Sequence, residues 1–370
     1  MSLVKDIEIP AIESAPFRIE NIVKSFPLGK GMEEFRAVNN LTLDFVPGGI
    51  TTLLGPSGCG KSTTLRIMAG FERQDSGSVI LDGKEIGSLP TNRRDLGMVF
   101  QNYALFPHLT VRKNISYGLD LKKLPPATIR ERVDAVLEIM QLSGKEDRYP
   151  NALSGGEQQR VAIARTIVVQ PKLLFFDEPL SNLDAKLRLK TRTEIRELQK
   201  RLGITTVYVT HDQEEAMAIS DRVVVLYQGE LQQVGTPREI YAEPANKFVA
   251  DFIGTSNLIS CQVVGTNAEN IEVSLEGAVF SVTPSHNRIY TPGDHVQIMT
   301  RPSFWRLDPN GAVVATVTSV AYLGDYVEYH MCTRAGQNFI FADYYHVSHG
   351  MKAVGEELRL SIRNESLRFI

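Results

Sequence analysis

Short apolar segments recur through the first 236 residues, separated by polar turns and by longer stretches of helical pattern. The predicted strands are β-rich runs at residues 50–54, 79–81, 96–100, 173–176, 206–210 and 222–227. The run at 173–176, LLFF, contains no polar residue, which is typical of a strand buried on both faces. Such strands form parallel sheets covered by helices, so we expect an α/β core.

The segment from residue 99 to 171 has a helical pattern instead. Within 127–142 its apolar residues recur at helical spacing and would share one face: Ile129, Val133, Val136, Leu137 and Met140. We interpret this stripe as the core-facing side of a helix. Residues 185–202 predict a second helix, rich in Lys and Arg. Because Glu194 and Glu197 are interspersed, we interpret it as a solvated face rather than an RNA-binding surface.

The pattern changes again after residue 237. Pro237 and Pro244 lie in a connector, and from Leu258 onward short β-rich runs alternate with turn residues. The runs lie at 271–275, 279–282, 296–300, 313–317, 327–332, 338–341 and 358–362. This spacing predicts a small all-β domain, most simply a barrel.

Composition excludes several classes of protein. The 370 residues carry a formal net charge of -3, so there is no overall attraction to nucleic acid or to an anionic membrane. We expect no transmembrane helix, because no run of about 18 apolar residues occurs, and no secretion signal in residues 1–20. Cys59, Cys261 and Cys332 lie far apart, which argues against a zinc site. Together these features predict a cytoplasmic protein of two or more domains.

Residues 55–62, GPSGCGKS, fit the pattern G-x-x-x-x-G-K-[ST] of a phosphate-binding loop between a strand and a helix. Its glycines let backbone N–H groups surround phosphates at a helix N-terminus. Lys61 would reach the β- and γ-phosphates, and the Ser62 hydroxyl would bind Mg²⁺. The predicted nucleotide-binding residues of this loop are Gly55, Ser57, Gly58, Cys59, Gly60, Lys61, Ser62 and Thr63. We assign Cys59 no redox role.

Two acids, Asp177 and Glu178, follow the buried run at 173–176. At the end of such a strand, Asp177 would help to hold Mg²⁺. Glu178 would act as the general base that polarises the attacking water. A phosphate-binding loop and an acid pair together predict hydrolysis of a nucleoside triphosphate.

Four further elements, in the right order, resemble ATP-binding-cassette ATPases. Residues 153–160, LSGGEQQR, resemble the family's signature motif, and 181–184, SNLD, its aspartate loop. Gln101 matches the glutamine loop and His211 the switch histidine. The segments at 102–108, 236–241 and 248–254 resemble the importer subfamily that serves sugars, polyamines, ferric iron and sulfate. The tail, at 301–302, 322–324 and 354–355, is similar to the regulatory barrel of that subfamily.

The resemblance implies a domain plan of the α/β class. A P-loop NTPase core with an antiparallel β subdomain and a helical insert would be followed by an all-β, OB-like barrel. The ATPase domain would span 1–240, with the helical subdomain at about 102–170. A connector at 241–257 would lead to the regulatory domain at 258–370.

The resemblance also implies a mechanism. In a head-to-tail homodimer, each ATP would lie between the P-loop of one copy and the signature of the other. The implied nucleotide-binding residues outside the P-loop are Phe26, Gln101, Ser154, Gly155, Gly156, Glu157 and Asp184. The implied catalytic residues are Glu178, His211, Lys61 and Gln101, and the implied Mg²⁺ ligands are Ser62, Gln101 and Asp177.

The implied partners are other proteins of a transporter and not nucleic acid. Residues 103–118 would receive a coupling helix of an integral membrane permease, and an external solute-binding protein would act indirectly. The chain would lie at the cytoplasmic face of the inner membrane as a peripheral subunit. The solute is open between a polyamine, which we favour from 322–324, a sugar and ferric iron.

Two departures and three alternatives remain. Glu157 stands where the family usually has Gln, and Phe35 competes with Phe26 for adenine because the segment after Phe26 is long. The first alternative is a soluble ATPase of this family acting in DNA repair or translation. A GTPase would need an N-K-x-D motif, which residues 246–249 lack. A non-catalytic regulator is disfavoured because the catalytic residues are present.

Overall fold

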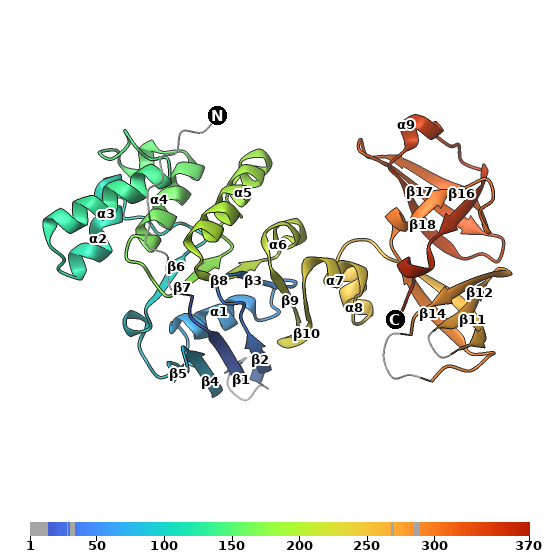
Figure 1. Ribbon diagram of the computed structural model, residues 1–370, viewed down its shortest axis with the longest axis horizontal. Coiled ribbons are helices and arrows are strands. Elements are labelled where there is room, and N and C mark those ends of the chain that lie inside the picture. Colours follow the sequence, from blue (N-terminus) through green and yellow to red (C-terminus); the bar gives the residue numbers. More distant parts are fainter. Residues whose placement is uncertain (1–13, 28, 30–33, 268–269, 285–288) are drawn as a thin grey trace. The chain divides into compact units, whose positions relative to one another are not determined.

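The computed structural model describes residues 14–27, 29, 34–267, 270–284 and 289–370 (Figure 1). The chain forms two compact units, Met1–Pro237 and Arg238–Ile370. The division falls near the expected end of the ATPase domain at residue 240. We describe the two units separately.

The first unit is built on a six-stranded sheet with the order β10-β9-β3-β8-β7-β6. These strands are β3 (Ile50–Leu54), β6 (Leu96–Val99), β7 (Leu173–Asp177), β8 (Thr205–Thr210), β9 (Arg222–Tyr227) and β10 (Glu230–Gly235). All neighbours pair in parallel except β9 and β10. Leu173 and Phe175 of β7 enter one hydrophobic cluster and Leu174 and Phe176 another, because successive side chains point to opposite faces. The expected doubly buried strand is thereby confirmed.

A four-stranded antiparallel sheet with the order β2-β1-β4-β5 lies on one side of this core. Its strands are β1 (Phe17–Pro27), β2 (Glu34–Asp44), β4 (Ser76–Leu81) and β5 (Lys84–Glu85). Phe17, Ile19 and Val79 pack in one cluster with Leu65 and Met68 of α1 (Lys61–Ala69). Helix α1 is therefore held between the two sheets.

Helices form the other side of the six-stranded sheet, as Figure 1 shows for α2 to α4. They are α2 (Val111–Leu121), α3 (Pro126–Ile139), α4 (Gly155–Ile167), α5 (Ala185–Leu202) and α6 (Gln213–Ile219). The predicted stripe at 127–142 corresponds to α3, which buries Val133, Val136 and Leu137 and ends just before Met140. The helix predicted at 185–202 is confirmed as α5.

Arg94, after the short 3-10 turn Thr91–Arg93, joins α1 to the chain that leads into β6. Its side chain is buried and donates only to backbone carbonyls. Nη1 bonds Ile67 O (2.6 Å) and Met68 O (2.9 Å), Nη2 bonds Gly87 O (2.7 Å), and Nε bonds Leu89 O (2.9 Å). One guanidinium therefore satisfies the carboxyl end of α1, whose last carbonyls have no partner within the helix.

The second unit is mostly β structure around its own hydrophobic cluster. It contains α8 (Lys247–Phe252) and α9 (His346–His349), and α7 (Pro237–Ala242) starts at its boundary. One five-stranded sheet comprises β11 (Asn257–Thr266), β12 (Ile271–Leu275), β13 (Ala278–Val282), β14 (His295–Thr300) and β20 (Arg368–Phe369). The other comprises β15 (Trp305–Leu307), β16 (Val313–Tyr322), β17 (Val327–Thr333), β18 (Asn338–Asp343) and β19 (Glu357–Ile362). The expected all-β C-terminal domain is confirmed, and the residues predicted as a connector, 241–257, include α8.

Arg301 plays a role in the second unit like that of Arg94 in the first. Its guanidinium is fully buried. It donates to the carbonyls of Tyr241 (3.0 Å) and Ala250 (2.7 Å), at the ends of α7 and α8, and lies 4.6 Å from the Tyr241 ring centre. Across the described part of both units, no helix is long and apolar enough to span a bilayer.

Candidate functional site

The loop at 55–60 lies between β3 and α1, with Gly58 and Gly60 in the left-handed region (φ 80° and 97°). A Cβ on Gly60 would lie 2.2 Å from the carbonyl oxygen of Ala37 in β2. The same oxygen faces Gly229 in the β9–β10 turn, where a Cβ would lie at 2.9 Å. Gly229 also donates its N–H to Cys59 O (3.2 Å). Two backbone segments outside the nucleotide-binding motifs, at Ala37 and at Gly229, therefore pack against the loop and support it.

Lys61 is buried, with 6% of its surface exposed. Its ammonium donates to two carbonyls of its own loop, Gly55 O (2.6 Å) and Pro56 O (2.9 Å). The Cys59 sulfur lies 3.8 Å away, and burial raises the pKa of this thiol, so it stays protonated at neutral pH. The loop thus holds a fixed positive charge beside its curled backbone, as phosphate binding requires.

Ser62 and Asp177 meet across the loop and β7, with Oγ 3.4 Å from Oδ1. Burial, and next the charge of Glu178, raise the pKa of Asp177. A cation would favour the ionised carboxylate, and these oxygen ligands are of the kind that Mg²⁺ prefers. The residues therefore fit a Mg²⁺ ion completed by phosphate and water. Gln101, the third predicted ligand, is exposed, and in the described chain no hydrogen bond joins it to Ser62 or Asp177.

Glu178 and His211 form a contact at the same edge, with Oε2 3.2 Å from Nδ1. They come together because they follow β7 and β8, which are parallel neighbours. Glu178 has an uncommon backbone conformation (φ 46°), held by its N–H on Val209 O (3.0 Å) and by Ser181 Oγ on its carbonyl (3.0 Å). The carboxylate is therefore positioned at the sheet edge, directly after the aspartate that meets Ser62.

The residues of the signature lie at the start of α4. Ser154 is the N-cap: its Oγ accepts from Glu157 N (3.4 Å), and Glu157 Oε2 accepts from Ser154 N (2.7 Å), a reciprocal capping box. Gly156 is buried against Leu187 of α5, where a Cβ would lie 3.0 Å from Cδ1. None of the hydrogen bonds in the described chain connects Ser154, Gly155 or Gly156 to the P-loop. Glu157, the departure from the family pattern, is therefore used to cap its own helix.

Asp184 caps α5 by accepting from Leu187 N (2.9 Å). Two residues earlier, Asn182 donates to Gln101 O (2.9 Å) and joins the two predicted loops. Phe26 and Phe35 are direct cross-strand partners in β1 and β2, so they occupy one surface and the choice between them stays open. The longer segment between them lies partly outside the described residues.

Two supporting networks were missed from the sequence. Arg165 of α4 donates to Tyr103 O (3.0 Å) and Ala104 O (2.7 Å), which follow Gln101. The buried Glu215 of α6 accepts from Thr210 Oγ1 (2.8 Å) and from the Tyr208 hydroxyl (3.2 Å), directly before His211. An acid three residues after the Thr-His-Asp run at 210–212 is the only sequence signal for either.

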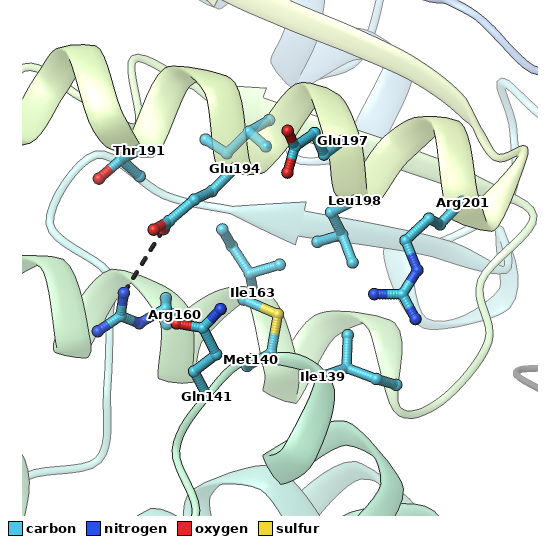
Figure 2. A pocket seen from close by; sticks show the side chains of 11 residues that line it. Ile139, Met140, Gln141, Arg160, Ile163, Thr191, Glu194, Glu197, Leu198 and Arg201 are labelled. Atoms are coloured by element: carbon cyan, nitrogen blue, oxygen red, sulfur yellow. Dashed lines mark hydrogen bonds and ion pairs between the residues drawn. The ribbon is translucent and has the colours of Figure 1, made fainter. Parts of the chain in front are cut away.

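A separate cavity of about 110 Å³ lies between the end of α3 and helices α4 and α5 (Figure 2). Ile163 and Leu198 line it, and Arg160 faces Glu194 across it at 3.5 Å. None of the predicted nucleotide-binding residues lines this cavity. It is smaller than usual small-molecule pockets, so we assign it no ligand.

Residues 38–181 match the model of the ABC transporter family, and 294–370 match that of the TOBE domain. The chain is 46% identical over 332 residues to the Fe(3+) ions import ATP-binding protein FbpC of Brucella abortus (strain 2308), covering 89% of this chain and 91% of that protein. It is 44% identical over 312 residues to the spermidine/putrescine import ATP-binding protein PotA of Clostridioides difficile (strain 630), covering 84% and 88%.

A solved structure resembles part of this chain. It is the dimeric, post-hydrolysis state of the ATP-binding cassette MJ0796 bound to ADP and phosphate. The TM-score is 0.54 at 32% identity, over 60% of this chain and 99% of that chain. The nucleotide-binding core therefore has counterparts both in sequence and in fold.

Proposed function

Because this chain belongs to the ABC transporter family as one of its import ATP-binding proteins, we propose that it drives uptake of ferric iron through a membrane permease. The chain is an ATPase that binds ATP with Mg²⁺. The observation that carries the ATPase part of the proposal is the convergence of Lys61, the Ser62–Asp177 pair and the Glu178–His211 contact at one sheet edge.

The proposed roles follow from these contacts. Lys61 binds phosphate oxygens, and Ser62 and Asp177 hold Mg²⁺, which neutralises phosphate charge. Glu178 accepts a proton from the attacking water, whose oxygen bonds to the γ-phosphorus as the bond to the leaving ADP oxygen breaks. His211 holds the Glu178 carboxylate (Nδ1 to Oε2, 3.2 Å) and would donate to the phosphoryl oxygens. Gln101 is proposed as the sensor, through its backbone link to Asn182.

The site is proposed to be completed by a second copy. Ser154 is exposed at the start of α4 and has no hydrogen bond to the P-loop of its own described chain. The similar cassette of known structure is dimeric. A head-to-tail dimer would place the signature donors of one copy, Ser154 to Gly156, on the γ-phosphate bound by the other.

The other partners are proposed from the family. Residues 103–118, with α2, would contact the permease at the cytoplasmic face of the membrane, and a solute-binding protein would deliver the solute. Ferric iron replaces the polyamine that residues 322–324 favoured, because relatives at 46% and 47% identity carry the name of a ferric iron importer. A polyamine is the second candidate, since a relative at 44% identity is named for spermidine and putrescine. These relatives do not support a role in DNA repair or translation.

The substitution Glu178→Gln tests the ATPase mechanism. Removing the base should lower turnover by about 10²–10⁴-fold while ATP still binds, so that an ATP-bound dimer accumulates on size-exclusion chromatography. Glu214→Gln is the matched control, because Glu214 lies three residues after His211 and its side chain is 89% exposed. Turnover by Glu178→Gln equal to that of the control would contradict the assignment of the base. Uptake of radiolabelled ferric iron and spermidine, by cells with and without the chain, then decides between the two solutes.

A further inference from the structure

The signature helix begins with a carboxylate that has two partners. Glu157 Oε2 accepts from Ser154 N (2.7 Å), and Oε1 forms an ion pair with Nζ of Lys145. Only 17% of the Glu157 side chain is exposed and 28% of that of Lys145. The hydrogen bond from Lys145, and next that from Ser154, lower the pKa of Glu157 to about 2, so it is negatively charged at every physiological pH.

Lys145 lies in the loop between α3 and α4, and this loop is held in place. Its carbonyls at Glu146 and Arg148 accept from Arg112 N (2.9 Å) and Val111 N (2.8 Å) at the start of α2. The Lys145 N–H itself donates to Leu142 O (3.1 Å). An ordered backbone therefore holds the Lys145 ammonium beside Glu157, whereas a lysine on a mobile surface segment would lose conformational entropy on forming such a pair.

A negative charge at this position conflicts with the proposed use of the signature. The donors of Ser154 to Gly156 would face the γ-phosphate of the ATP bound by the other copy, and a nearby uncompensated carboxylate would repel that phosphate. Two like charges in a partly desolvated interface are costly, and a cation on the carboxylate removes most of that cost.

We propose that Lys145 is a positioning residue of the composite ATPase site, which compensates the charge of Glu157 and holds its carboxylate on the Ser154 N–H. The signature then presents hydrogen-bond donors to the phosphate without a net negative charge. This inference rests on the proposed two-copy site. Lys145 lies outside the nucleotide-binding motifs, and the use of Glu in place of Gln at position 157 depends on it.

The experiment measures ATP hydrolysis by the full chain against MgATP concentration, for Lys145→Met, Glu157→Gln and the double variant. Lys145→Met should raise the MgATP concentration for half-maximal turnover by about tenfold, and the effect should shrink at high salt. In the double variant this MgATP concentration should return most of the way to the wild-type value, because the neutral amide that replaces the carboxylate needs no compensating cation. Lys172→Met is the matched control: it breaks a Lys–Asp pair (Lys172 with Asp82, 3.4 Å) that lies apart from the signature.

Thermal unfolding of the same variants distinguishes a role in the stability of the fold from a role in the ATPase site. If the pair only stabilises the fold, Lys145→Met and the double variant lose the same activity in proportion to their stability, and the inference is overturned. A half-maximal concentration for Lys145→Met equal to that of Lys172→Met also overturns it, while the proposed function stands. If the wild type hydrolyses no ATP, the proposed function and this inference fall together.

Discussion

Arg94 offers the sharpest test of how the nucleotide-binding unit is held together. We consider Arg94→Met, which keeps much of the volume of the side chain and removes its donors. Ile67 O retains the N–H of Gly70 (3.1 Å). The carbonyls of Met68, Gly87 and Leu89 lose the guanidinium, although all three lie in or beside elements that stay packed.

The magnitude follows from these three acceptors. A buried polar group left without its partner costs about 1–3 kcal/mol, so three cost roughly 3–9 kcal/mol. Part of this is offset because burial disfavours the guanidinium itself, as the lowered pKa of Arg94 indicates. We expect a net loss of about 3–5 kcal/mol, which is a melting temperature lower by about 10 °C for a unit of this size.

Calorimetry and circular dichroism measure this change, with Arg93→Met as the control, because Arg93 is the exposed neighbour. The single tryptophan of the chain, Trp305, is buried in the second unit and supplies an internal reference. Arg94→Met should lower the unfolding temperature measured by helical circular dichroism. It should leave the unfolding temperature measured by Trp305 fluorescence unchanged. The reasoning is refuted if Arg94→Met and Arg93→Met unfold at the same temperature, since the buried carbonyls would then not depend on Arg94.

Three further outcomes are expected. Phe26→Ala and Phe35→Ala, compared by nucleotide titration, should show which ring stacks on adenine: its loss should weaken ATP binding by about 1–3 kcal/mol, and equal effects would mean that neither ring alone is the platform. Asp221 bonds Arg196 through both oxygens (2.7 and 2.5 Å), and this lowers the pKa of Asp221. The ionised Asp221 therefore contributes its full stabilisation to the free energy of unfolding above its unfolded pKa of about 3.9, and this contribution is lost as pH falls through the lower folded pKa. Measured by urea unfolding, the stability of Asp221→Asn should fall less than that of the wild type as the pH drops below about 4. Chelation of Mg²⁺ should abolish hydrolysis while Ser62→Ala, which loses one ligand, should need more Mg²⁺ for half-maximal activity; an unchanged requirement would exclude Ser62 as a ligand.

The parts of the fold that the sequence predicted are those with a local signal. The run at 173–176 is uniformly apolar and α5 has helical spacing, so both were predicted with nearly the observed bounds. Strands β1 and β2 were missed because register shifts interrupt their pairing and their burial does not alternate regularly. The order of the strands depends on which apolar faces meet in space, and no local pattern records it.

The same division holds for the candidate site. Lys61, Ser62, Asp177, Glu178 and His211 belong to motifs whose spacing is short or whose order is specific. Arg94, Arg165 and Lys145 act on backbone carbonyls or on a helix cap, and their partners lie at positions that are not neighbours in sequence. An arginine that bonds to backbone carbonyls leaves no complementary residue to search for, and the Lys145–Glu157 ion pair joins two positions that share no motif. These supporting residues became visible only in three dimensions.

The support of the P-loop by Gly229 has a consequence for the way this sequence can change. Every single-nucleotide change of a glycine codon that alters the residue adds a Cβ atom, and the space at Gly229 is filled by the Ala37 carbonyl at 2.9 Å. Its left-handed conformation (φ 79°) strains most other residues as well. We therefore expect a single-nucleotide substitution at Gly229 to displace the Ala37 carbonyl or to strain the turn that supports the P-loop. The requirement for glycine at Gly60 of the phosphate-binding loop therefore extends, through the same Ala37 carbonyl, to Gly229, a residue outside the nucleotide-binding motifs.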